Sequence, residues 1–349
     1  MLDVGGPEDT CDPYLCIPDS GQEGNYVALS YCWRKDTDAF VTTTSSNIRN
    51  RKAGIPLSSL PTALREAVHL TKRFDSRYLW VDALCIIQGD EVDWVTNAAK
   101  MDEVYGNAVL IIAAVSAASC MQGVLSPSLF RHWKLHSQVT PDDEPINHRA
   151  WTLQERLLSH RYLSFGTEYM TWQCQTLTRV RHPETEMGDH GIGPFALRTY
   201  HFSEISTNPF NLWLRIIIDY TSRHLTKKGD KLPALSSIAK AIHEHTHDQY
   251  LAGLWRRDIL RLLLWRVDNN ILKSIPVYRP EKYRAPSWSW ASIEGNISLL
   301  WANGGEGSAL RAEFIDCTIE PLSTEDPFGK VKSGTLVLRG PLKQASGIR

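Results

Sequence analysis

The sequence lacks three features that would each define a class of protein: a long apolar segment, an excess of charge of one sign, and paired cysteines. Its longest apolar runs, Val109–Val115 and Leu214–Ile218, fall far short of the roughly 18 residues that a membrane-spanning helix needs. Lys and Arg number 38 and Asp and Glu 39, a net charge of −1, which removes the electrostatic reason to bind nucleic acid or an anionic membrane.

The start of the chain has neither the basic residues nor the apolar stretch of a secretory signal, so we expect a cytoplasmic protein. The seven cysteines are odd in number, and no two have the two-residue spacing of a zinc or redox site. We therefore expect free thiols and no metal centre. His243 and His247 lie one helical turn apart, but no third ligand is evident.

What is present is an ordinary globular composition, with 42% hydrophobic and 22% charged residues over 349 positions. That length predicts about two domains. Apolar segments at 26–33, 77–82 and 108–114 predict strands, and helical spacing at 60–74 and 94–105 predicts helices between them. Because the strands are continuously apolar and alternate with helices, the pattern predicts an α/β fold: a parallel sheet with covering helices.

The chain downstream predicts a mainly helical region with additional C-terminal strands. We expect an irregular lead-in at 1–25, an α/β domain at 26–175, an irregular excursion at 176–208, and a region at 209–349 that packs partly on the α/β domain. The expected elements are helices at 149–158, 210–224, 232–247 and 250–267, and strands at 162–165, 169–174, 309–319 and 334–340. The alternation of Trp with small residues at 284–292 predicts a strand or an extended segment.

Polar residues follow the predicted parallel strands at the sheet edge where α/β proteins bind ligands. Ser30 and Tyr31 there could donate hydrogen bonds to a ligand, and Trp33 could form a pocket wall or pack in the core. Asp82 could cap the turn that follows it or face the pocket, and it needs a partner if buried. Cys32 and Cys85 are either inert buried thiols or nucleophiles, although the sequence places no histidine base beside them.

Several motifs occur in one order that resembles the fungal heterokaryon incompatibility (HET) domain family. They include Tyr26-Val-Ala-Leu-Ser-Tyr-Cys-Trp33, Leu60-Pro-Thr-Ala-Leu-Arg-Glu-Ala67, Tyr78-Leu-Trp-Val-Asp-Ala-Leu-Cys-Ile-Ile-Gln88, Arg149-Ala-Trp-Thr-Leu-Gln-Glu155 and Pro286-Ser-Trp-Ser-Trp-Ala-Ser292. The resemblance covers about 26–175 and extends in pieces to about 297. The sequence departs from the family pattern at Arg34, where the family usually has Gly, and at Ile87, where it usually has Asn.

The resemblance implies a role in recognition between fungal strains and in the death of fused, incompatible cells, with a protein partner or self-association. HET domains are remotely similar to Toll-receptor-type (TIR) domains, which implies a flavodoxin-like sheet. Some TIR domains cleave NAD with a glutamate near a Trp-Cys motif. That analogy implies an alternative function, an enzyme of the NAD glycohydrolase type with NAD as its substrate. A biosynthetic or hydrolytic enzyme that uses the same fold is a further alternative. We expect that no cofactor is required.

By that resemblance Glu155, four residues after Trp151, is the position implied for catalysis, with Trp151 a candidate for the pocket. A carboxylate there could hold a ribose hydroxyl and stabilise an oxocarbenium-like centre. The residues also fit a structural alternative, since Thr152-Leu-Gln-Glu155 has the spacing of a capping box. In that arrangement Thr152 caps a helix and Glu155 reaches back to its amide.

Overall fold

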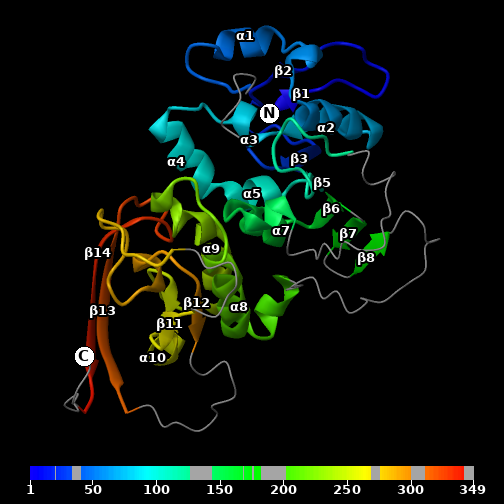
Figure 1. The fold of residues 1–349 in the computed structure, drawn as a ribbon. Coiled ribbons are helices and arrows are strands. Elements are labelled where there is room, and N and C mark those ends of the chain that lie inside the picture. The colour runs from blue at the N-terminus through cyan, green and yellow to red at the C-terminus, as the bar shows by residue number, and fades with distance from the viewer. Residues whose placement is uncertain are drawn as a thin grey trace. The chain divides into compact units, whose positions relative to one another are not determined.

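The structure is a computed structural model that describes residues 1–19, 21–33, 41–125, 144–167, 169–174, 177–181, 202–268, 276–299 and 311–341 (Figure 1). The chain divides into two compact units, Met1–Ser203 and Glu204–Arg349. Each unit is described by itself. Arg34, one of the two departures from the family pattern, and most of the excursion predicted at 176–208 lie outside the described residues.

One eight-stranded mixed sheet organises the first unit. Its order is β2-β1-β4-β3-β5-β6-β7-β8, and strands β4, β3, β5 and β6 are parallel. The outer strands at both edges pair antiparallel. The strands are β1 (Leu2–Asp3), β2 (Tyr14–Leu15), β3 (Tyr26–Ser30), β4 (Tyr78–Trp80), β5 (Leu110–Ala113), β6 (Arg161–Phe165), β7 (Met170–Cys174) and β8 (Thr178–Arg181).

The predicted parallel sheet over residues 26–115 is confirmed. Val27 lies opposite Leu79 on β4 and Leu110 on β5, in parallel register on both sides. The α/β class is therefore correct. The flavodoxin-like and TIR-like assignment is not confirmed, because β7 and β8 add antiparallel pairings beyond β6 and the described residues add no further parallel strand to this sheet.

Helices cover both faces of this sheet (Figure 1). Helix α2 buries Ala63, Leu64, Ala67 and Val68 against one face, while α5 and α7 lie on the other. Asp90 caps α4 as its position predicts, by accepting from the amides of Val92 and Asp93. The elements are α1 (Ile48–Ala53), η1 (Leu57–Ser59), α2 (Thr62–Arg73), α3 (Asp82–Cys85), α4 (Glu91–Ala99), α5 (Met101–Gly106), η3 (Pro145–His148) and α7 (Trp151–Leu158).

The second unit contains two of the three helices predicted there, at α8 and α9. A third helix over 250–267 is wrong, since Ala252 (φ 45°) and Gly253 (φ 100°) are left-handed and turn the chain into a tight hairpin. Its elements are η4 (Phe202–Ser206), α8 (Pro209–Thr221), η5 (Lys228–Asp230), α9 (Pro233–Thr246), β9 (Tyr250–Leu251), β10 (Leu254–Trp255), η6 (Arg256–Asp258), α10 (Ile259–Leu262), β11 (Trp265–Val267), η7 (Trp290–Ser292), β12 (Ile297–Leu299), β13 (Glu313–Pro321) and β14 (Val331–Arg339).

A strand over 284–292, one of the two alternatives predicted there, is also wrong. Ser289 folds back, accepting a hydrogen bond from the Ala291 amide and donating to the Ala252 carbonyl, and the chain forms turns and the short helix η7. The alternation of Trp with small residues therefore reflects tight turns rather than a strand. The paired strands β13 and β14 confirm the two strands predicted nearest the C-terminus.

All seven cysteines are free thiols in the structure. Over the described residues, the helices are too short or too polar to cross a bilayer. The cytoplasmic location stays a prediction.

Gly253 supplies the first stability test. Its φ of 100° disfavours any side chain, and an added Cβ would lie 2.8 Å from Trp290 Nε1. Its carbonyl also accepts from the indoles of Trp213 and Trp290. We expect Gly253→Ala to lower the free energy of unfolding by about 1–3 kcal/mol in urea denaturation. Gly229→Ala, whose Cβ would enter open space, is the matched control and should change stability far less.

Candidate functional site

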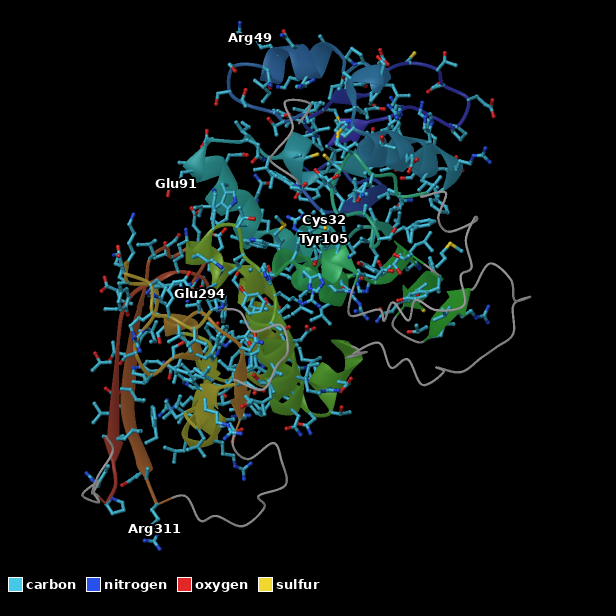
Figure 2. The ribbon with its side chains drawn as sticks, viewed as in Figure 1. Cys32, Arg49, Glu91, Tyr105, Glu294 and Arg311 are labelled. Carbon is cyan, nitrogen blue, oxygen red and sulfur yellow. The ribbon has the colours of Figure 1, made fainter. Side chains whose placement is uncertain are left out.

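The candidate site begins where β3 ends. Side chains alternate along a strand, so Ser30 and Cys32 face α5 and α7 while Tyr31 faces the opposite side of the sheet. Ser30 is fully buried, and its hydroxyl donates a 2.5 Å hydrogen bond to Glu155 Oε2 on α7. Figure 2 labels Cys32 beside Tyr105, and both belong to the apolar cluster on this face.

Glu155 is not a helix-capping residue. Helix α7 starts at Trp151 rather than after Thr152, and no side chain caps it. The Thr152 hydroxyl instead donates to the carbonyls of Ile146 and Arg149. The capping-box interpretation is therefore wrong, because Thr152 is already inside the helix. The Glu155 side chain, 8% exposed, turns inward to the sheet.

Asp82 is the first residue of α3, and its carboxyl group is hydrogen-bonded to neighbouring protein groups. Its Oδ1 accepts from the Ala83 amide at 2.7 Å and from Trp33 Nε1 at 2.9 Å. It thus ties the end of β4 to the segment after β3. The buried Tyr31 hydroxyl lies close to this carboxyl, yet within the described part of the chain it makes no hydrogen bond of good geometry.

Arg149 joins these groups and was missed from the sequence. Its guanidinium donates to the main-chain carbonyl of Tyr31 and interacts electrostatically with Glu155, Asp82 and Cys32. The available signal was its position six residues before Glu155 in the same motif. Tyr105 of α5, which hydrogen-bonds with Glu155, was missed as well.

The electrostatics of the two carboxyl groups favour protonation. Burial raises the pKa of Glu155 to about 7; Arg149 and the hydrogen bonds from Ser30 and Tyr105 oppose this rise, and the charge of Asp82 adds to it. Burial also raises the pKa of Asp82, again opposed by Arg149 and by Trp33. A single guanidinium therefore faces two desolvated carboxyl groups.

The two thiols differ in their surroundings. Burial raises the pKa of Cys32, although Arg149 opposes the rise, so the thiol form is favoured. The Cys85 sulfur accepts a hydrogen bond from the Val81 amide at 3.3 Å, and burial raises its pKa too. Neither environment activates a nucleophile.

The remaining predicted residues are placed as follows. Trp151 packs edge-to-face on Trp94, with ring centroids 6.2 Å apart. Ile87, the second departure from the family pattern, is anchored through its main chain, because its amide donates a hydrogen bond to Asp93. Among the described residues, no three His, Cys, Asp or Glu side chains gather as a metal site. His243 Nδ1 instead lies 2.7 Å from the Asp248 carbonyl oxygen.

Chemically, the cluster of Ser30, Asp82, Tyr105, Arg149 and Glu155 is suited to proton transfer and hydrogen bonding. A carboxyl group that titrates near neutral pH can give or accept a proton at working pH. Ser30 and Tyr105 orient it, and Arg149 stabilises its charged form. We call this set the carboxyl cluster.

The geometry defines an α/β domain with a buried carboxyl site at the end of its first parallel strand. Residues 26–155 match a family model described as "Heterokaryon incompatibility protein (HET)". The chain is also similar to the curated "Heterokaryon incompatibility protein 6, OR allele" of Neurospora crassa, with 29% identity over 116 residues. That alignment covers 31% of this chain and 17% of the Neurospora protein. No solved structure matches the chain.

This chain therefore carries a HET domain over residues 26–155. The matched residues end at Glu155, so all five members of the carboxyl cluster lie among them.

Glu155 predicts a pH-dependent stability. Its pKa is about 7 in the fold and near 4.3 in an unfolded chain, so the fold binds this proton more tightly. The contribution of this bound proton to the free energy of unfolding is complete below about pH 4 and is lost as the pH rises to 7. The parent should therefore lose stability relative to Glu155→Gln between pH 4.5 and 7.5, by up to roughly 3 kcal/mol in urea denaturation.

The exposed Glu103 on the neighbouring helix α5 offers a control for this measurement. Glu103→Gln should reproduce the pH profile of the parent. A Glu155→Gln profile that also runs parallel to the parent would show that Glu155 does not carry a proton at neutral pH.

Proposed function

We propose that this chain acts in fungal non-self recognition of the heterokaryon incompatibility type and that its output is programmed cell death. The HET domain and the name of the Neurospora relative support the proposal. Because the alignment spans 17% of that relative, the comparison bears on the domain and not on the whole protein. We also propose that the output requires self-association or a protein partner.

We place the activity in the carboxyl cluster, and one observation carries this assignment. Glu155 is buried and bonded to Ser30 of the central strand, not used to cap its own helix. A buried carboxyl group with too little positive charge around it lowers stability, and such groups concentrate at functional sites. The carboxyl end of β3 lies between β4 and β5, where the strand order reverses direction and α/β sheets form their crevices.

The same cluster supports a second candidate, a glycohydrolase that takes NAD or a related nucleotide as substrate. In such a reaction water replaces the base at the ribose carbon. A carboxylate stabilises the positive charge that develops on the sugar. With a pKa near 7 the Glu155 carboxyl group is partly ionised at neutral pH, and its approach to Ser30, Tyr105 and Arg149 supports the ionised form that this chemistry needs. Asp82 is the second carboxyl group of the proposed site.

Inducible expression of the full chain in a filamentous fungus tests the assignment. We expect the parent to kill the cells. Glu155→Gln keeps the side-chain shape and an oxygen that accepts from Ser30, so it should accumulate as folded protein and leave the cells viable. Glu103→Gln should be as lethal as the parent. A lethal Glu155→Gln variant at equal protein level would remove Glu155 from the activity.

Cellular NAD measured in the same cultures separates the two candidates. A fall in NAD that precedes death, and is absent with Glu155→Gln, would support the glycohydrolase. Death with unchanged NAD would support signalling without NAD cleavage. Harmless expression of a folded parent would contradict a cell-death output from this chain alone.

A further inference from the structure

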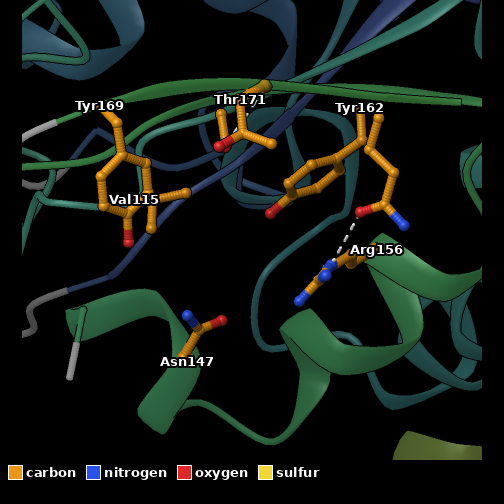
Figure 3. Close-up of a pocket in the computed structure, with 8 residues that line it drawn as sticks. Val115, Asn147, Arg156, Tyr162, Tyr169 and Thr171 are labelled. Carbon is orange, nitrogen blue, oxygen red and sulfur yellow. Dashed lines mark hydrogen bonds between the residues drawn. The ribbon is translucent and has the colours of Figure 1, made fainter. Parts of the chain in front are cut away.

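A second polar site lies on the same face of the sheet as α7, beside the carboxyl cluster but separate from it (Figure 3). It is a small recess that opens partly to solvent. Its floor comes from β6 and β7, and its other side from η3 and α7. The lining residues are Val115, Asn147, Arg156, Tyr162, Ser164, Tyr169, Thr171 and Gln173. We call it the Arg156 pocket.

The sheet register explains why this floor is polar. Ser164 lies opposite Thr171, and Tyr162 lies opposite Gln173, so all four side chains share the face under α7. The row through Ser164 continues through Ala113 of β5 to Ser30 of β3. The row therefore has small side chains from Ser30, which bonds Glu155, to Ser164 in the pocket.

The Arg156 guanidinium is hydrogen-bonded through Nε, which leaves its two terminal nitrogens to donate to a ligand. Its Nε donates to Gln173 Oε1 at 3.2 Å, which fixes the plane of the guanidinium. Figure 3 shows the end of the side chain reaching from α7 into the space between the strands and Asn147. An arginine so oriented presents its two terminal nitrogens as a fork that matches phosphate or carboxylate oxygens.

The charge balance favours an anion. Among the described residues, Arg156 is the cationic member of the lining, which contains no Asp or Glu there. Glu144 and Glu155 lie on adjoining described segments, and both have other partners. Glu144 accepts from the amide and hydroxyl of Thr167 at 2.6 and 3.0 Å, and Glu155 accepts from Ser30.

Thr171 gives an independent sign that a polar ligand belongs here. The residue is 4% exposed, and its hydroxyl has no hydrogen-bond partner within the described parts of the chain. The neighbouring Ser164 hydroxyl makes one long contact of 3.5 Å, to the Thr171 carbonyl. Buried hydroxyls without partners are uncommon in folded proteins and cost stability. A ligand with its own polar groups would satisfy them.

We propose that the Arg156 pocket binds a small hydroxylated molecule through one oxyanion group, a phosphate or a carboxylate. Arg156 holds the oxyanion, and the hydroxyls of Ser164 and Thr171 bond the ligand's neighbouring oxygens. This inference does not depend on the proposed function, because no member of the carboxyl cluster lines the pocket.

Titration calorimetry of the purified full chain with inorganic phosphate and with acetate, at constant ionic strength, tests the proposal. We expect saturable binding of at least one anion at one site per chain. Stronger phosphate binding would identify a phosphorylated ligand, and stronger acetate binding a carboxylic acid. Arg156→Gln should weaken binding about tenfold or more, as expected for the loss of a charged hydrogen-bond donor. Arg161→Gln, an exposed arginine on β6, should bind like the parent.

Thr171→Val keeps the proposal testable if Arg156→Gln fails to fold. This change removes a hydroxyl that has no bond to lose in the described structure, so stability should hold while anion binding weakens. Glu155→Gln should bind the anions like the parent, which separates this result from the proposed function. No saturable binding of either anion, or binding that Arg156→Gln and Thr171→Val leave unchanged, would overturn the proposal.

Discussion

The arrangement of the HET domain depends on one cation at the end of one strand. Arg149 donates to the main-chain carbonyl of Tyr31, which directly follows β3. From there its charge reaches Glu155, on the face covered by α7, and Asp82, which follows β4. Without this guanidinium, hydrogen bonds such as those from Ser30 and Trp33 would be left to oppose the desolvation of the two buried carboxyl groups. Arg149 thus adds to these hydrogen bonds in holding the segment before α7 to the ends of two parallel strands.

The approach of α7 to the sheet also limits the size of the side chains that the sheet can carry beneath this helix. Glu155 and Arg156 are consecutive on α7, and each reaches the sheet at a different strand: Glu155 at β3 through Ser30, and Arg156 at β7 through Gln173. The row of Ser30, Ala113 and Ser164 between them consists of small residues. Large apolar side chains there would fill the space that both polar groups occupy.

The sequence predicted what depends on local pattern. Continuous apolar segments identified β3, β4 and β5, and their crossover helices identified the parallel pairing. The topology placed Ser30 at the expected sheet edge and the family resemblance indicated Glu155, and the two side chains are hydrogen-bonded in the structure. The sequence could not identify Arg149, because an arginine before a helix has no local pattern that distinguishes a buried partner from a solvated side chain.

In both failures a specific contact overrides a local preference. Thr152 has the spacing of a helix cap, but helix α7 already includes it, and its hydroxyl bonds the carbonyl of Ile146 in the preceding turn. Residues 250–267 have helical periodicity, but Gly253 adopts a positive φ against the packed indole of Trp290. The contact between Gly253 and Trp290 is not visible within a window of neighbouring residues.

Two buried glutamates in this chain show how burial can be distinguished from function. Burial opposes the ionised form of Glu294 in the second unit, but Lys231, Arg284 and Lys228 outweigh it and lower its pKa. Salt bridges to these three cations make Glu294 a structural anchor.

Glu155 has the opposite balance, since it shares one arginine with Asp82 and its pKa is raised. In the same chain, three cations neutralise the carboxylate of Glu294. Among the described residues Glu155 lies beside fewer cations than Glu294, and this electrostatic contrast, more than burial itself, supports the proposal that the Glu155 carboxyl group exchanges a proton.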